Sequence, residues 1–482
     1  MTRKSLITFF LIFTAFASAQ RGDDALAKAE PVTAITHVTM INVNSGTAIA
    51  DQTVIITGAK ITEVGSALKV SVPKEATKID GLGKYLIPGL WDMHVHMAGI
   101  TADPHWNQPL LGVMLAYGIT GMRDMGGNLP DLQFWRSEIE AGRMAGPRIV
   151  ASGPMLDGTE SHMPISMAAN TPFIARNNAA AAKNMGADFI KILNNIPKDA
   201  YLEIAKFSTE LKIPFVGHIP PEVSAAEASD AGQKSIEHLE GIQLGCSDKE
   251  DDLRKAMLEA RKAKDQTAYS KARDEAIATF SQKKCEALFA KFKGNGTWQV
   301  PTQVWTRAFA TMDKADPKDS NLKYLPESVT KDWTVEKLNK DVPEVARKIY
   351  ATRFEQGKKY IKLMNAQGVG LLAGSDSIDP YVFTGTALHD ELALFIEEGL
   401  TSAEALRTAT LNPAKFFGRD DLGTIQTGKL ADMVLLSADP LKDIHNTRKI
   451  EGVWTNGRYF DRASLDKILE EAKRAALAYR PN

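Results

Sequence analysis

Charge of one sign, cysteine and long apolar runs are all scarce in this sequence of 482 residues. Its 58 basic and 59 acidic residues leave a formal net charge of −1, which predicts no basic surface for nucleic acid and no polybasic membrane patch. Beyond the N-terminal segment, no apolar run reaches the roughly 20 residues that a membrane-spanning helix needs. The composition therefore favours small molecules as partners over nucleic acid or a membrane.

The N-terminal segment MTRKSLITFFLIFTAFASAQ has the pattern of a secretory signal peptide. A basic start precedes an apolar run over residues 6–17, and small residues precede the expected cleavage after Ala19. The alternative is a membrane anchor, but an apolar run of about a dozen residues is short for that purpose. We predict that residues 1–19 are removed. Losing Arg3 and Lys4 changes the net charge from −1 to −3, and the mature chain is expected to be secreted or periplasmic and free of the membrane.

The two cysteines, Cys246 and Cys285, gain significance from the expected export, because an oxidising compartment permits disulfides. Both lie in a highly charged stretch over residues 246–293 that is typical of helix. We predict a helical insert here, arranged as a hairpin whose ends are joined by a disulfide. Two unpaired thiols in separate helices are the alternative.

The two ends of the chain are both rich in β-branched residues and in turn-forming residues. Residues 31–87 and 421–462 both consist of short alternating segments separated by glycine turns, so we predict that they pair into one small β-sandwich. An amphipathic helix is expected within residues 463–482.

Residues 88–420 alternate short apolar strands with helical segments, which is typical of a parallel α/β architecture. Eight strands are expected, centred on LWDMHVHM, ITGMRDM, PRIVASG, DFIKIL, PFVGHI, SIEHLE, WQVPTQV and VGLLAGSD. The predicted fold class is therefore α/β, a (β/α)8 TIM barrel with a small β-sandwich domain formed from both ends of the chain. In such a barrel the active site lies at the carboxyl ends of the strands.

Metal-ligand side chains recur at the ends of these strands. His94 and His96 are two residues apart on the first strand, so their side chains point to the same side. The fourth, fifth, sixth and eighth strands carry four more candidates: Lys191, His218, His238 and Asp376. Because the strand ends converge on one mouth of a barrel, these side chains should meet there. Imidazole nitrogen and carboxylate oxygen suit zinc or a similar divalent ion.

The segments PGLWDMHVHM, DFIKIL, VGHI, IEHLEG and LLAGSDS resemble the successive metal-ligand segments of the amidohydrolase superfamily. The lysine of the fourth strand is similar to that of the binuclear prolidase-like and imidazolonepropionase-like group. The resemblance covers nearly the whole chain after the N-terminal segment. It implies a metal-dependent hydrolase with two divalent ions.

The resemblance also implies a role for each candidate. One ion, zinc by ligand type, would be held by His94, His96 and Asp376, and a second by His218 and His238. Lys191 would bridge the two ions as an N-carboxylated lysine. A bridging hydroxide would attack the substrate carbonyl, with Asp376 as both ligand and general base that passes the proton to the leaving nitrogen.

Other polar residues are expected near the mouth of the barrel as substrate contacts. These candidates are Arg123, His162, Asn194, Gln303 and Tyr324. Arg123 is expected to meet a single substrate carboxylate, because no dense basic cluster suggests a polyanionic substrate.

Three functions are compatible with this pattern. The first is hydrolysis of an amide bond in dipeptides or N-acyl amino acids, as in a prolidase or dipeptidase. The second is hydrolysis of a cyclic amide, lactone or xenobiotic ester at the same site, because one fold and metal centre serve many substrates. The third, a non-catalytic scaffold, is disfavoured because all six ligand positions are filled. Assembly into a homo-oligomer is left open.

Overall fold

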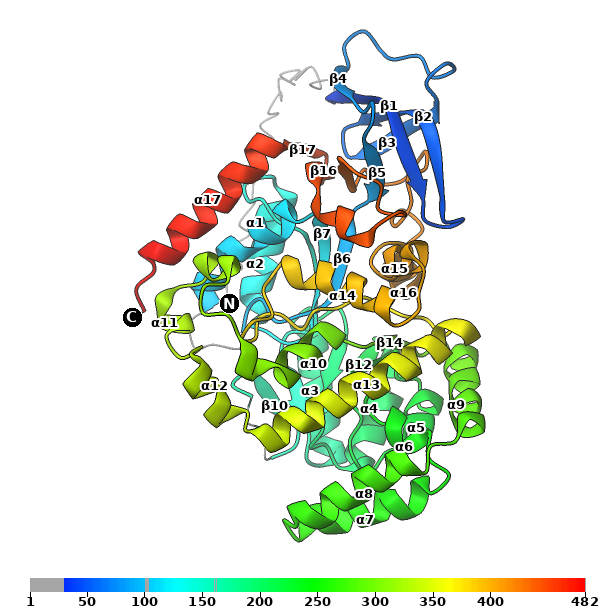
Figure 1. The fold of residues 1–482 in the computed structure, drawn as a ribbon, viewed down its shortest axis with the longest axis vertical. Helices are drawn as coiled ribbons and strands as arrows, with labels where there is room; N and C mark the ends of the chain where they lie inside the picture. The colour runs from blue at the N-terminus through cyan, green and yellow to red at the C-terminus, as the bar shows by residue number, and fades with distance from the viewer. Residues whose placement is uncertain (1–29, 100–103, 160, 162, 482) are drawn as a thin grey trace, which may run out of the picture.

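The computed structural model describes residues 30–99, 104–159, 161 and 163–481 (Figure 1). The predicted signal peptide, residues 1–19, lies outside the described residues. Within the described residues, no helix combines the length and the apolar character that crossing a membrane requires.

Strands from both ends of the chain form one eight-stranded mixed sheet. The N-terminal strands are β1 (Val32–Asn42), β2 (Thr47–Thr57), β3 (Lys60–Ser66), β4 (Thr77–Asp80) and β5 (Tyr85–Pro88). The C-terminal strands are β15 (Met433–Leu436), β16 (Ile450–Thr455) and β17 (Arg458–Asp461). The two groups meet where β15 pairs antiparallel with β5, in the order β17-β16-β15-β5-β1-β2-β3 with β4 beside β1. The pairing of the chain ends is confirmed, whereas a two-layered sandwich stays a prediction.

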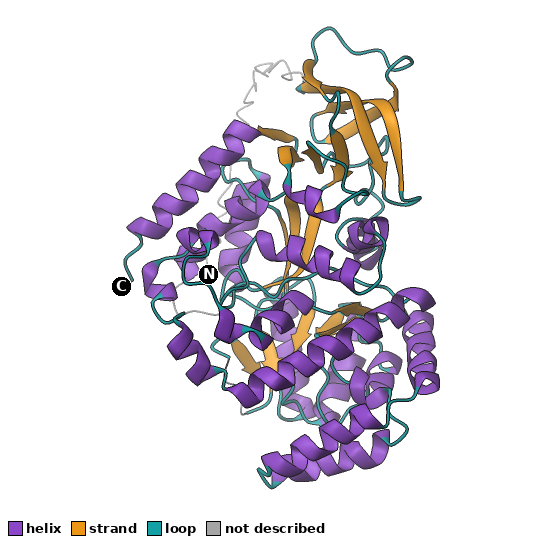
Figure 2. Cartoon of the chain, viewed as in Figure 1, coloured by secondary structure: helices purple, strands orange, loops and turns teal. Residues whose placement is uncertain are grey.

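The middle of the chain forms parallel sheets surrounded by helices, which confirms the α/β class (Figure 2). One sheet contains β6 (Leu90–Val95), β7 (Ile119–Asp124) and β8 (Arg148–Ala151). The other has the order β10 (Ser166–Ala168), β9 (Met155–Asp157), β11 (Ile190–Ile192), β12 (Phe215–Gly217), β13 (Ser235–Glu237) and β14 (Trp298–Val300). Apart from β10 at the sheet edge, most of their residues are buried, as expected for strands covered on both faces.

Backbone hydrogen bonds connect these two sheets at two places. The Asp188 N–H donates to the Ala151 carbonyl (2.9 Å), which links the end of β8 to the start of β11. On the other side, residues 371–377 bond to β14 and to β6, including an Asp376 N–H donated to the His94 carbonyl (2.7 Å). The expected eighth strand is not a regular strand, because it pairs only through isolated bridges. It nevertheless places Asp376 beside His94.

Helices cover the parallel strands, and one further helix follows the mixed sheet at the C-terminal end of the chain. Those before the insert are α1 (Gln108–Ala116), α2 (Leu129–Glu140), α3 (Pro172–Asn184), α4 (Lys198–Leu211), α5 (Ala225–Asp230) and α6 (Ile242–Gly245). Those after it are α10 (Gln303–Ala310), α11 (Glu327–Thr330), α12 (Val335–Asp341), α13 (Glu344–Gln367), α14 (Thr386–Glu397), α15 (Ser402–Thr408), α16 (Leu411–Phe417) and α17 (Arg462–Ala478). The C-terminal helix α17, capped by Asp461, packs along α1.

The charged insert contains three helices, and the expected two-helix hairpin is wrong. They are α7 (Glu250–Lys262), α8 (Gln266–Ala278) and α9 (Gln282–Asn295), with α7 and α8 farthest from the mixed sheet (Figure 1). The additional break follows from Asp265, whose carboxylate accepts the backbone N–H groups of Thr267 and Ala268 and so begins a new helix. The expected disulfide is present: Cys246, directly after α6, is bonded to Cys285 in α9, with both side chains fully buried.

Removing this disulfide should destabilise the insert more than the strands. The bond closes a loop over a sequence separation of 39 residues. In the chain-entropy model such a loop contributes about 4 kcal/mol to the free energy of unfolding. We expect a Cys246→Ser/Cys285→Ser variant to melt at a lower temperature in calorimetry. Mass spectrometry of the unreduced wild-type protein should find the linked peptide pair. Recovery of two alkylated thiols without reductant would refute the bond.

Candidate metal centre and adjoining cavity

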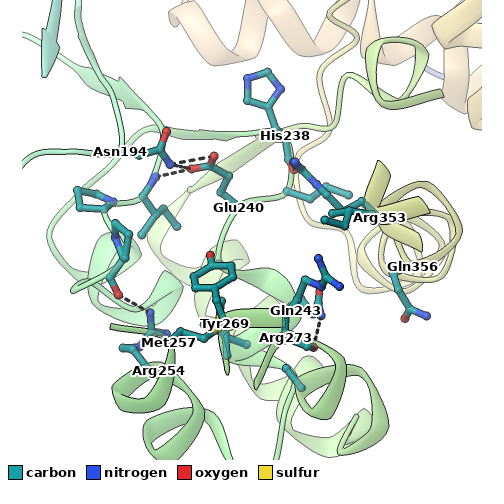
Figure 3. A pocket seen from close by; sticks show the side chains of 18 of the residues that line it. Asn194, His238, Glu240, Gln243, Arg254, Met257, Tyr269, Arg273, Arg353 and Gln356 are labelled. Carbon is teal, nitrogen blue, oxygen red and sulfur yellow. Dashed lines mark hydrogen bonds between the residues drawn. The ribbon is translucent and has the colours of Figure 1, made fainter. Parts of the chain in front are cut away.

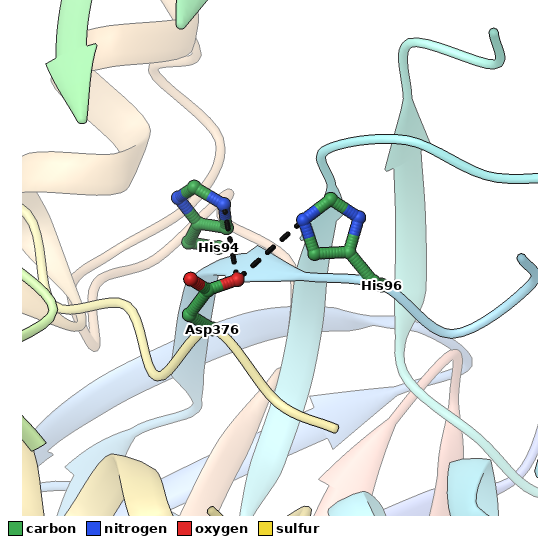
Figure 4. Close-up of side chains that lie close together, drawn as sticks. All are labelled: His94, His96 and Asp376. Carbon is green, nitrogen blue, oxygen red and sulfur yellow. Dashed lines mark ion pairs between the residues drawn. The ribbon is translucent and has the colours of Figure 1, made fainter. Parts of the chain in front are cut away.

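Two histidines and one aspartate lie together at the carboxyl end of β6 (Figure 4). His94 and His96 project from the same side of the strand, as their spacing predicts. The Nε2 atoms of His94 and His96 lie 3.4 and 3.5 Å from Asp376 Oδ1. All three residues are buried, and one ligand atom from each lies within 4.8 Å of the others. This is a group of donors that could hold a metal ion.

The other two predicted histidines continue the cluster from β12 and β13. His238 Nε2 lies 3.7 Å from Asp376 Oδ2, and the His238 ring is 4.8 Å from the ring of His94 between centroids. The ring of His218 is 5.0 Å from that of His238. His238 and Asp376 both have positive φ angles, 58° and 59°, which non-glycine residues adopt mainly where the surroundings require it.

Lys191 lies in β11 and is only 1% exposed. Burial lowers the pKa of its ammonium. Lys191 lies close to the cluster. After burial, its positive charge is the second largest cause that lowers the pKa values of His94, His96 and His218. The sequence-predicted ligand set is therefore brought to one end of the parallel strands.

Each of the four histidines uses its Nδ1 atom for a contact outside the cluster. The partners are Glu237 for His94 (2.8 Å), the Gly126 carbonyl for His96 (3.0 Å), Asn194 for His218 and Thr302 for His238 (2.7 Å). Such contacts fix the tautomer and the orientation of a metal-binding imidazole. They direct the remaining Nε2 atoms toward the cluster.

The chemistry of this donor set fits a divalent ion. Burial lowers the pKa of all four imidazoles, that of His96 to about 3, so their Nε2 lone pairs are free of protons near neutral pH. The Nε2 atom of His94 is buried and has no hydrogen-bond partner among the described residues. A buried nitrogen of this kind costs stability unless an ion or water satisfies it. Neutral imidazoles with one carboxylate are ligands that zinc accepts.

Arg123 does not face a substrate, which corrects the expectation from the sequence. Its side chain is fully buried in β7, and its Nη2 donates to both carboxylate oxygens of Glu237 at 3.0 Å. The remaining donors reach the Met93 carbonyl and the Ser235 hydroxyl. Because Glu237 also holds His94 Nδ1, Arg123 acts through Glu237 to position a metal-ligand candidate.

The remaining substrate candidates have different surroundings. Asn194 lines the cavity described below but also joins His218 to Glu240. Gln303 also lines this cavity, but it is buried and its amide donates to Glu398 (2.9 Å). Tyr324 is buried at the end of a short helical turn that packs against α17, and it is not among the described residues lining that cavity. His162 lies outside the described residues.

A cavity of about 340 Å³ opens next to His238 and extends toward the insert (Figure 3). His238 and Asn194 line its metal end, whereas Met257 of α7 and Tyr269 of α8 line the opposite end. Arg353 of α13 forms part of the side wall near His238. The insert therefore forms one wall of the space that a molecule at the cluster would occupy.

Comparison with known protein families identifies a matching segment of the chain. Residues 335–460 match a family model described as the amidohydrolase family. Among characterised proteins, adenine deaminase of Ligilactobacillus salivarius is 37% identical over 68 residues, which are 14% of this chain and 12% of that protein. The matched stretch thus spans little more than a tenth of the length of this relative.

Solved structures match over nearly the whole chain. A Xaa-Pro dipeptidase with bound methionine in its active site is 20% identical with a TM-score of 0.66, covering 89% of this chain and 100% of that one. A prolidase complexed with N-methylphosphonate-L-proline is 21% identical with a TM-score of 0.64, again covering 89% and 100%. At these identities the likeness establishes the fold.

Proposed function

We propose that the chain is a member of the amidohydrolase superfamily and that it is a metal-dependent hydrolase that cleaves an amide bond in dipeptides or N-acyl amino acids. The observation that carries the proposal is the convergence of four imidazoles, a lysine and Asp376 beside a cavity at the ends of parallel strands. We further infer that the two parallel sheets and residues 371–377 close into a (β/α)8 barrel. The hydrogen bonds that connect the two sheets at two places support this closure.

The ligand assignment extends the group of His94, His96 and Asp376 to two ions, zinc by ligand type. His218 and His238 would hold the second ion, with Lys191 as an N-carboxylated bridge. A buried lysine deprotonates more readily, which favours reaction of its amine with carbon dioxide. The modification would replace a positive charge that lowers the pKa of all four imidazoles with a negative one. When bound, such ions polarise a carbonyl and lower the pKa of water.

Asp376 is the residue placed to move protons. Its carboxylate faces the Nε2 atoms of three histidines at 3.4–3.7 Å, so it lies at the centre of the cluster. In this position Asp376 would accept a proton from the attacking water and donate it to the leaving nitrogen. Met257 and Leu258 line the far end of the cavity and would contact an apolar part of the substrate.

Turnover of a substrate panel by the metal-loaded protein tests the proposal. We expect hydrolysis of dipeptides and N-acyl amino acids with an apolar acyl side, detected by release of the free amine. Treatment with a chelator should abolish the activity, and added zinc should restore it, because the donor set holds no other electrophile. A matched panel of lactones, cyclic amides and esters serves as the comparison. Preferential hydrolysis of that second panel would contradict the proposed substrate class.

Export and assembly are additional proposals. The basic start and apolar run of residues 1–19 support secretion or delivery to the periplasm, and the buried disulfide is compatible with an oxidising compartment. N-terminal sequencing of the protein from its native compartment should begin after Ala19. Sedimentation of the purified chain would establish whether it forms a homo-oligomer.

A further inference from the structure

We propose that Arg353 binds the carboxylate of the substrate and thereby restricts this enzyme to free-acid substrates. The inference rests on the proposed amide hydrolysis and identifies the residue that would select the leaving group. Arg353 takes the carboxylate-binding role that the sequence suggested for Arg123, because the guanidinium of Arg123 is buried and bonded to Glu237.

Arg353 differs from the other three arginines that line the cavity. Arg254 pairs with Glu250 (2.6 Å), Arg273 pairs with Asp274 (2.8 Å), and Arg261 donates to Asn195 (2.5 Å). Among the described residues, Arg353 has no carboxylate partner, and its one hydrogen bond is a long contact of 3.5 Å to the His238 carbonyl. A half-buried guanidinium with free donors is suited to a bidentate bond with a carboxylate.

The acid nearest to this part of the cavity is already engaged. Both carboxylate oxygens of Glu240 accept from the Asn194 amide, at 3.0 and 2.8 Å, and one also accepts the Ile219 N–H. Glu240 therefore directs its oxygens toward the β11 and β12 side of the cavity, opposite Arg353 in Figure 3. This leaves the guanidinium of Arg353 available for a ligand.

Packing of α13 holds Arg353 in place. The guanidinium lies 5.6 Å from the ring centroid of Tyr350, one turn earlier on the same helix. One turn later, Gly357 lets α13 approach α10 so closely that an added Cβ would lie 2.3 Å from Gln303 Nε2. A preorganised cation loses little side-chain entropy when it binds an anion.

The position of Arg353 fits the geometry of an amino-acid leaving group. Its contact with the His238 backbone places it next to the cluster that would act on the scissile carbonyl. In an N-acyl amino acid or a dipeptide, the carboxylate carbon is only two bonds from the scissile nitrogen. If more than one residue followed the scissile bond, a peptide group would lie where Arg353 binds the carboxylate. Arg353 would thus favour cleavage that releases a single C-terminal amino acid.

Matched acid and amide substrates test this assignment. The probes are N-acetyl-L-leucine and N-acetyl-L-leucinamide with metal-loaded wild-type, Arg353→Met and Arg353→Lys proteins. In Arg353→Met, kcat/KM for the acid should fall by about 30-fold or more, whereas kcat/KM for the amide should change by less than about 3-fold. Arg353→Lys should retain part of the preference for the acid. Arg143→Met removes an exposed arginine that pairs with Glu138 and is not among the described residues lining the cavity, so it should affect both substrates equally and little.

Binding of L-leucine and L-leucinol separates this inference from the proposed function. Calorimetry should show that Arg353→Met weakens leucine binding by at least about 10-fold and leaves leucinol binding unchanged. If that difference appears although no amide is hydrolysed, the carboxylate site stands and the proposed function fails. If amides are hydrolysed but acid and amide lose activity equally in a variant with normal metal content and normal circular dichroism, the assignment of Arg353 is overturned. Equal weakening of leucine and leucinol binding would overturn it as well.

Discussion

Replacing Lys191 by alanine should lower activity by at least about 100-fold and reduce the metal content from two ions per chain, while the protein stays folded. Lys191 is a buried residue of β11 whose positive charge lowers the pKa of all four histidines. If it bridges two ions as a carbamate, alanine leaves one shared ligand position empty. The second ion, with fewer protein ligands left, should then bind more weakly.

Selective rescue distinguishes a bridging ligand from a nearby charge. Acetate or propionate should partly restore the Lys191→Ala protein by occupying the empty position, whereas chloride at equal ionic strength should not. Lys198→Ala, at the exposed start of α4, is the matched control and should keep wild-type activity and metal content. Plasma mass spectrometry supplies the metal count. One tightly bound ion in both wild type and Lys191→Ala would refute the two-ion assignment.

The sequence predicts the ligand cluster because two rules suffice for it. Strand periodicity is a local rule, and the convergence of parallel strand ends follows from the order of the strands. Two histidines two apart in extended chain share a side, and this holds for His94 in β6 and His96 directly after it. The same rules place His218 and His238 together at the ends of β12 and β13. These arguments need only the order of the strands, which apolar patterning reveals.

The contacts that orient the ligands follow from no such rule. Glu237 bonds to His94 across 143 residues of sequence, so only the folded chain shows the pair. One signal was present: Glu237 is a charged residue in a short apolar strand, directly before His238, and such a residue needs a buried partner. Arg123 is likewise a charged residue in an apolar strand, β7. Because arginine often binds a substrate carboxylate, the sequence suggested that partner and not a carboxylate inside the protein. Arg353 was missed because it lies in a long helix outside the strand pattern.

The insert illustrates the same limit on a smaller scale. Composition predicts helix over residues 246–293, and the structure contains helix there. The number of helices depends on Asp265, a single capping residue within a long charged run. That the insert also lines the cavity depends on how α7 and α8 pack against α6, for which the local sequence gives no indication.

Replacing Arg123 by methionine should cause the largest loss of stability of the substitutions considered. The guanidinium and Glu237 form a fully buried pair, and removal of one partner leaves an uncompensated charge. Breaking such a pair costs about 3–5 kcal/mol. Because Glu237 also fixes His94, we expect Arg123→Met to bind zinc more weakly in addition to unfolding at lower denaturant concentration.

A double substitution isolates the pair from the individual side chains. Arg123→Met combined with Glu237→Leu removes both charges, so its stability should recover partly relative to Arg123→Met. Its zinc affinity should not recover, because the double variant also removes the Glu237 carboxylate that His94 Nδ1 contacts. Arg136→Met is the control: its bond to Asp188 is partly exposed, so its removal should cost no more than about 1 kcal/mol. Urea unfolding and zinc titration measure the two effects separately. If Arg123→Met instead kept wild-type stability and zinc affinity and lost only affinity for free-acid substrates, Arg123 would be the carboxylate-binding residue after all, and both its positioning role and the assignment of Arg353 would be wrong.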